Sequence, residues 1–137
     1  MYEYYKIENI EGVAYHFTST KTGKEYTVLF RYFHTTSDRK VVYSMIVTYK
    51  NFLINEELNT MINDAISITN SEWVILADFC KTYEPFKVVI GHSLKDGEAG
   101  EILGKRAKLF RRNMKTINGY ETKVDETNQN VTNIIKK

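Results

Sequence analysis

Alternating apolar and polar residues predict an antiparallel hairpin in the first quarter of the chain. Apolar side chains occupy every second position over residues 13–17 and again over residues 26–30, which is the period of a strand with one buried face. A polar, turn-forming stretch that contains Gly23 separates the two runs. We therefore expect residues 13–17 and 25–33 to pair as antiparallel strands.

The same period predicts further strands on both sides of this hairpin. Residues 41–49 alternate after a polar loop at residues 35–40, which gives a third strand. An N-terminal run that begins at Tyr2 and includes Ile7 is a candidate for a fourth strand.

Residues 55–69 are compatible with two interpretations. A helix capped by Asn55 would place Leu58, Met61 and Ile62 on one face. The alternation over residues 65–69 is equally compatible with a strand that returns to the sheet. The pattern leaves both interpretations open.

Helical spacing returns after this segment. Asn70 or Ser71 offers an N-cap for a helix that must end before Pro85, because proline cannot continue it. The short apolar run at residues 87–91 is typical of a central strand. A polar loop at residues 92–98 then leads to the last helical pattern of the chain.

Together these elements predict an α+β fold. We expect a two-layer sandwich, in which an antiparallel sheet of four to five strands carries two or three helices on one face. Residues 1–120 would form this single domain. Residues 121–137 are rich in polar residues and hold few aliphatic ones, so we expect a loosely ordered C-terminal tail.

Residues 71–114 resemble a group of small uncharacterised proteins of bacteria and their phages. The order there is a helix, Tyr-x-Pro ending at Pro85, an apolar strand, a polar loop, and a helix with Arg106, Leu109 and Phe110 in an Arg-x-x-Leu-Tyr/Phe motif. The resemblance covers about a third of the chain. It implies an α+β layer fold and a bacterial or phage origin, but no activity.

Cysteine content and hydropathy point to a cell interior. A single cysteine, Cys80, excludes an intramolecular disulfide, which favours a reducing compartment. We expect no signal peptide and no membrane span, because the chain has no basic-then-apolar start and no stretch of about 18 apolar residues. These features predict a soluble protein of the cytoplasm, or of the host cytoplasm if a phage encodes it.

Basic residues gather on the last predicted helix, residues 99–117. Its basic face, opposite an apolar stripe, comprises Lys105, Lys108, Arg112 and Lys115, with Arg111 beside it. Such a face can meet phosphates, yet a helix that covers a sheet also needs a solvated side. The net charge of +2 is too small to indicate nucleic acid by itself. Nucleic acid is therefore a candidate partner class but not the leading one.

Arg106 falls on the apolar side of the same helix. A buried arginine needs a partner to offset the loss of its hydration. We expect an ion pair with Asp78 or Glu84, or hydrogen bonds to carbonyl oxygens. The alternative is that Arg106 recognises an anion beside the loop at residues 92–98.

That loop is the candidate site for acid–base chemistry. It follows a strand and precedes a helix N-terminus, where backbone amides favour anions, and His92 and Asp96 are the candidate binding residues. Its spacing matches no phosphate-binding glycine loop and no hydrolase elbow. The three histidines are too scattered for a metal site. We therefore assign no catalytic residue, no metal and no cofactor.

Aromatic residues exceed what a core of this size needs, with 10 Tyr and 7 Phe. Strand alternation must place part of the following set on an outer face: Tyr2, Tyr4, Tyr5, Tyr15, Tyr26, Tyr32, Phe33, Tyr43 and Tyr49. Exposed tyrosine clusters are typical of protein interfaces, although cross-strand aromatic pairing explains them equally well.

Three hypotheses of function follow. The leading one is a non-enzymatic binding or assembly protein that acts through an aromatic-rich sheet surface, on a protein partner or by self-association. The second is an anion or nucleic-acid binder that uses the basic face. The third is a small enzyme centred on the loop from His92 to Glu98. None of the three involves a membrane.

Overall fold

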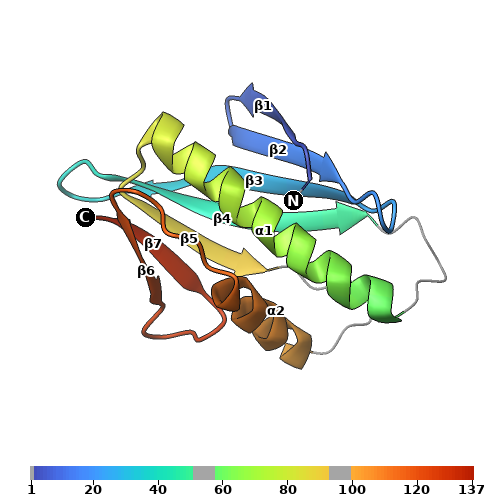
Figure 1. Cartoon of the computed structure of the whole chain (residues 1–137). Helices are drawn as coiled ribbons and strands as arrows, with labels where there is room; N and C mark the ends of the chain where they lie inside the picture. The colour runs from blue at the N-terminus through green and yellow to red at the C-terminus, as the bar shows by residue number, and fades with distance from the viewer. Residues whose placement is uncertain (1, 51–57, 93–99) are drawn as a thin grey trace.

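A computed structural model describes residues 2–50, 58–92 and 100–137 of the chain and shows a single mixed sheet with two helices (Figure 1). The sheet has seven strands in the order β1-β2-β3-β4-β5-β7-β6. The strands are β1 (Tyr5–Asn9), β2 (Gly12–Thr18), β3 (Glu25–Thr35), β4 (Val41–Lys50), β5 (Lys87–His92), β6 (Tyr120–Val124) and β7 (Thr132–Lys136). The helices are α1 (Leu58–Tyr83) and α2 (Gly100–Arg112).

The first four strands form an antiparallel meander. The predicted hairpin is confirmed, since β2 and β3 pair with Val13 opposite Phe30 and Tyr15 opposite Val28. The third predicted strand is β4, and β1 pairs with β2 at the edge of the sheet. Period-two alternation located β2 and β3 because each of them buries a single face, whereas all five residues of β1 are exposed.

The second half of the sheet corrects the expected fold. The chain crosses from β4 through α1 to β5, and this crossover makes β5 parallel to β4. An antiparallel sheet of four to five strands in a two-layer sandwich was therefore the wrong expectation, because the sheet is mixed and has seven strands. Of the two or three expected helices, the described part of the chain contains two.

The C-terminal segment that was expected to be a loose tail supplies two of these strands. Strand β7 lies between β5 and β6 and pairs antiparallel with both. Ile134 is completely buried, so one well-placed aliphatic side chain and two ladders of backbone hydrogen bonds hold the segment. Counting aliphatic residues underestimated this backbone contribution.

Helix α1 is continuous across the region where two elements were expected. Residues 58–69 are helical, which settles the open choice between helix and strand, and the helix passes through the predicted N-cap at Asn70 or Ser71. The Ser71 hydroxyl donates to the carbonyl of Ser67 and accepts from the backbone N–H of Tyr2 at 2.8 Å. Its polar character therefore serves a contact with the N-terminal segment rather than a helix start.

Helix α2 ends at Arg112, earlier than the expected residue 117. The side-chain amide of Asn113 donates to the carbonyl of Leu109 at 2.9 Å. The indole N–H of Trp73 donates to the carbonyl of Phe110 at 2.8 Å. Trp73 thus occupies the carbonyl of Phe110, which the backbone N–H of Met114 would use if the helix continued, and that N–H donates to Arg111 instead.

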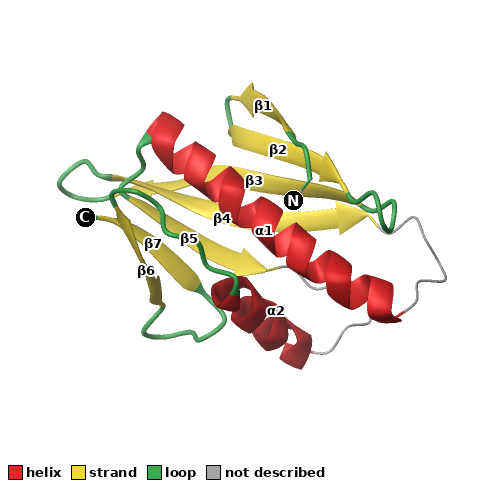
Figure 2. Ribbon diagram, in the orientation of Figure 1, coloured by secondary structure: helices red, strands yellow, loops and turns green. Residues whose placement is uncertain are grey.

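Both helices cover the same face of the sheet, as Figure 2 shows. Phe79 of α1 stacks on Phe30 of β3 with ring centroids 3.9 Å apart, and Trp73 of α1 stacks on Phe110 of α2 at 4.4 Å. Arg111 of α2 donates to the hydroxyl of Thr132 on β7 at 3.1 Å. The core therefore lies between the helices and this face.

Candidate functional site

The face of the sheet opposite the helices carries a straight row of aliphatic side chains. Ile7 lies opposite Ala14, Ala14 opposite Leu29, and Leu29 opposite Ile46, on four consecutive strands. Leu29 points away from the helices because its neighbour Phe30 points toward α1. We call Ile7, Ala14, Leu29 and Ile46 the open-face row.

Within the described residues, the open-face row is only partly covered. Ile7 is 49% exposed, and the other three side chains are intermediate between buried and exposed. Neither helix reaches this face, since both pack on the other one. A contiguous apolar strip that stays in contact with water is typical of a surface that docks another macromolecule.

A hollow of about 540 Å³ adjoins the row on the same face. Tyr5, His16, Thr27 and Thr48 contribute to its lining. The ring of Tyr5 stacks on His16 at a centroid distance of 5.1 Å, and the imidazole Nδ1 forms a 3.0 Å hydrogen bond with the Thr27 hydroxyl. The hollow therefore combines an aromatic wall with polar groups, which is the make-up of a protein-binding surface.

Strand β1 ends the sheet on this side and is fully exposed. All five of its residues are exposed, and its one described strand neighbour is β2. The apolar residues Tyr5 and Ile7 lie on the open face, and Ile10 at the hairpin tip is exposed as well. An exposed edge strand presents unpaired backbone N–H and C=O groups to any partner strand.

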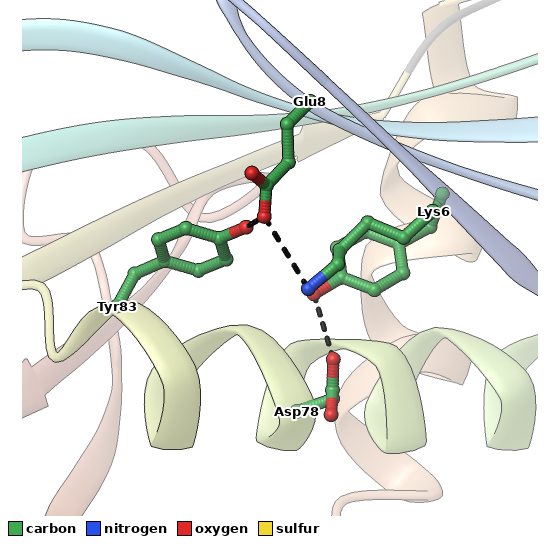
Figure 3. Close-up of polar contacts among 5 residues, drawn as sticks. Lys6, Glu8, Asp78 and Tyr83 are labelled. Atoms are coloured by element: carbon green, nitrogen blue, oxygen red, sulfur yellow. Dashed lines mark hydrogen bonds and ion pairs between the residues drawn. The ribbon is translucent and has the colours of Figure 1, made fainter.

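Polar contacts hold β1 above helix α1 (Figure 3). The hydroxyl of Tyr83 donates to the Glu8 carboxylate, and the Lys6 ammonium lies 3.5 Å from the same carboxylate. Lys6 also lies over the ring of Tyr83, 5.3 Å from its centroid. These contacts link the edge strand to the last turn of α1 and so help to fix its position.

The charges of this cluster are not arranged for proton transfer near neutral pH. The hydrogen bond from Tyr83 lowers the pKa of Glu8, and Lys6 lowers it further. Desolvation lowers the pKa of Lys6, but Tyr83 and Glu8 raise it by more. Burial, together with the hydrogen bond to Glu8, raises the pKa of Tyr83. All three shifts move away from neutrality, opposite to what a general acid or base requires.

A second tyrosine beside this cluster serves the core. The Tyr15 hydroxyl donates to the Asp78 carboxylate at 2.8 Å, and burial and this hydrogen bond raise the pKa of Tyr15. The ring of Tyr4 contacts Tyr15 edge-on at 5.7 Å. Tyr15 therefore remains a neutral donor, and the contact is structural.

The structure divides the predicted aromatic surface between the two faces. Tyr2, Tyr15 and Tyr26 are buried on the helix side, whereas Tyr5, Tyr32 and Phe33 are exposed. Tyr4 and Tyr43 are intermediate, and the side chain of Tyr49 lies outside the described ones. On the open face, polar residues such as His16, Thr27 and Thr48 therefore flank the single aliphatic row, and Tyr5 lies at its margin.

The open-face row was not predicted from the sequence, although the alternation of residues in two strands indicates it. Leu29 and Ile46 alternate with residues of the buried face such as Phe30 and Met45. Aliphatic residues on the outer face of two adjacent strands indicate a strip that needs cover. The register that aligns them with Ile7 and Ala14 became visible only in the folded sheet.

The four cations of the basic face are exposed to solvent. Lys105, Lys108 and Arg112 of α2 are exposed, and Lys115 is exposed beyond the end of the helix. Arg111 is partly buried through its bond to Thr132. The solvated position of these cations is compatible both with a simple helix exterior and with a phosphate-binding surface.

Arg106 is half-buried and lies within electrostatic range of Glu72 on α1. Its positive charge lowers the pKa of Glu72, against the larger effect of burial, which raises that pKa to about 8. Asp78 is bonded to Tyr15 instead. This electrostatic attraction acts between α2, which carries Arg106, and α1, which carries Glu72, and so gives a structural reason for an arginine at this position.

The proposed loop chemistry falls mostly outside the described residues. Asp96 and Glu98 lie there, and His92 is described only in its backbone, as the last residue of β5. Among the side chains that are described, no group of three His, Cys, Asp or Glu could hold a metal ion. Among the residues that the structure describes, no helix combines the length and apolar character needed to cross a membrane.

Comparison with known proteins gives no family. The sequence matches no protein-family model and no curated protein. The function must therefore be argued from the residues, faces and edges described above.

Proposed function

We propose that this protein is a non-enzymatic binding or assembly protein that docks a protein partner on the open face of its sheet. The observation that carries the proposal is the open-face row, which runs across four strands and remains in contact with water. Burial of apolar area contributes about 25 cal/mol per Å², so covering this strip would stabilise a complex. The neighbouring hollow and exposed Tyr5 add polar and aromatic groups at its margin.

The resemblance of residues 71–114 to small bacterial and phage proteins supports a bacterial or phage origin for this binding protein. The single cysteine supports a place of action in the cytoplasm. Both parts of the proposal rest on sequence features and stand apart from the geometric argument for the open face.

Site-specific photo-crosslinking in the source cell tests the proposal. A photoreactive residue in place of Leu29 should give discrete protein adducts, and Ile46→Lys should reduce their yield severalfold because it puts a charge in the docked strip directly beside Leu29. Ser44→Lys is the matched control, since Ser44 lies on the same strand and face, two residues from Ile46 and outside the lining of the hollow. Equal adduct yields from Leu29 and from an exposed position on α2 would contradict the proposal.

The exposed basic face supports a second candidate, an anion or nucleic-acid binder. Binding of a random single-stranded oligonucleotide should then weaken steeply with salt, and Lys108→Glu or Arg112→Glu should lower the slope of log K against log salt by about 1 each. Lys21→Glu, at an exposed turn remote from α2, is the control. Binding that is absent at low salt, or equally affected by Lys21→Glu, would remove this candidate.

A further inference from the structure

The outer edge of β1 presents the backbone groups of Lys6 and Glu8. A two-residue hairpin loop is closed by a hydrogen-bonded pair, here Asn9 and Gly12. Hydrogen-bonded and non-hydrogen-bonded pairs then alternate along the ladder, so Asn9, Ile7 and Tyr5 direct their N–H and C=O groups toward β2. The corresponding groups of Lys6 and Glu8 point away from the sheet.

We propose that β1 pairs antiparallel with β1 of a second copy of this chain, about a two-fold axis at Ile7. This inference rests on the proposed binding function and names both the partner and the register. Lys6 would lie opposite Glu8 of the second copy, and Glu8 opposite its Lys6. The two outward-facing residues of each strand would then exchange backbone hydrogen bonds across the axis, which makes the interface isologous.

Charge selects this register over its neighbours. A shift toward the N-terminus that centres the axis on Lys6 places two ammonium groups opposite each other, and a shift that centres it on Glu8 does the same with two carboxylates. Opposite charges in directly facing positions stabilise an antiparallel pair, whereas like charges destabilise it. Charged side chains usually protect an edge strand from pairing, but a lysine and a glutamate two residues apart permit one self-complementary pairing.

The same register joins the two open-face rows. Ile7 would face Ile7 of the second copy in a non-hydrogen-bonded pair, where side chains approach most closely. The row from Ile46 through Leu29 and Ala14 to Ile7 would continue directly into the row of the second copy. Pairing would therefore cover Ile7, which is 49% exposed in the single chain, and double the length of the apolar strip.

The opposite edge of the sheet lacks this combination. Strand β6 also carries a lysine and a glutamate two residues apart, Lys123 and Glu121, which lie 3.3 Å from each other. Its neighbours on the open face are Asn133 and Ile135 of β7, so no aliphatic row reaches that edge. Strand β6 is therefore a matched control for charge without an apolar strip.

Charge-exchange variants test the register by sedimentation velocity over a range of concentrations. Wild type should dimerise, and Lys6→Glu or Glu8→Lys alone should raise the dimer dissociation constant by roughly tenfold or more, because each places like charges opposite each other. An equimolar mixture of the two single variants should form a heterodimer, and the double variant Lys6→Glu/Glu8→Lys should dimerise again. The same exchanges at Glu121 and Lys123 should leave dimerisation unchanged.

The outcomes separate this inference from the proposed function. A wild type that stays monomeric at millimolar concentration overturns β1 pairing, while adducts at Leu29 would still support docking on the open face. A dimer that the exchanges at Lys6 and Glu8 leave intact, but that Leu29→Lys disrupts, also overturns the inference and places self-association on the face instead. Loss of binding in both experiments would remove the proposed function as well.

Discussion

At the scale of single residues, Glu72 is a carboxyl group inside the core. It is 6% exposed, and burial raises its pKa to about 8 although the charge of Arg106 opposes the shift. A raised carboxyl pKa means that the folded state binds a proton more tightly than the unfolded state. The contribution of Glu72 to stability is therefore most favourable in acid and declines as the pH rises from about 4.5 to about 8.

We predict that Glu72→Gln removes this decline. In wild type the Glu72 contribution to the unfolding free energy should fall by up to about 1.4 kcal/mol per pH unit across that window. Glutamine does not titrate, so the variant should lose stability less steeply and gain relative to wild type at pH 8. Urea denaturation at several pH values measures the difference, and identical pH profiles for the two proteins would contradict the prediction.

The partner of Arg106 shows what sequence can predict at this scale. Its position on the apolar side of a helix predicted that it needs a partner, and the structure places it beside an acid. The identity of that acid depends on how two helices dock, and Glu72 lies in a different helix from Arg106. Spacing along one helix could not predict that Arg106 lies within electrostatic range of Glu72.

At the scale of elements, the junction of β1 and β2 depends on a close backbone approach. A Cβ atom added at Gly12 would lie 2.1 Å from the carbonyl oxygen of Phe30, and backbone atoms cannot yield as a flexible side chain does. Glycine is thus required where the edge hairpin meets β3.

We predict that Gly12→Ala destabilises the protein by about 1–3 kcal/mol through this overlap. Gly91→Ala is the matched control, because no atom lies within 4 Å of the added methyl group there. The control should be neutral or slightly stabilising, since glycine is costly inside a strand. Chemical denaturation compares the two, and equal stability of both variants would show that the hairpin relaxes without cost.

Strands were more predictable than helix limits for a physical reason. Strands such as β2 and β3 bury one face each, so buried apolar residues recur at every second position of their sequence. The start of α1 could not be predicted because serine is a common N-cap residue. Ser71 instead lies within the helix, where its hydroxyl bonds Ser67 and Tyr2. The end of α2 was likewise set by Trp73, which lies 37 residues away in the chain.

At the scale of the whole molecule, the C-terminal strands complete the sheet. Strand β7 lies between β5 and β6, and Ile134 is completely buried against the helix layer. Lys136 donates its backbone N–H to the carbonyl of Phe86 at 2.9 Å, which extends the pairing with the segment before β5. The topology follows from long-range pairing, which local polarity in residues 121–137 does not reveal.

We predict that deletion of residues 125–137 abolishes cooperative thermal unfolding, because it removes β7 and leaves one side of β5 without a partner. Ile134→Ala gives a graded comparison and should cost about 2–5 kcal/mol, as expected for a fully buried isoleucine. Circular dichroism melting curves measure both. A deleted protein that melts like the full chain would mean that these strands contribute little to stability.

The interior place of β7 also has a consequence for synthesis. Strands β1 to β4 pair with neighbours in sequence and can close hairpin by hairpin as the chain leaves the ribosome. Strand β5 can join β4 at that stage, but its other side waits until β7 has been translated. A nascent chain paused before residue 132 would therefore display an unpaired edge of β5, where chaperones can dock or premature aggregation can begin.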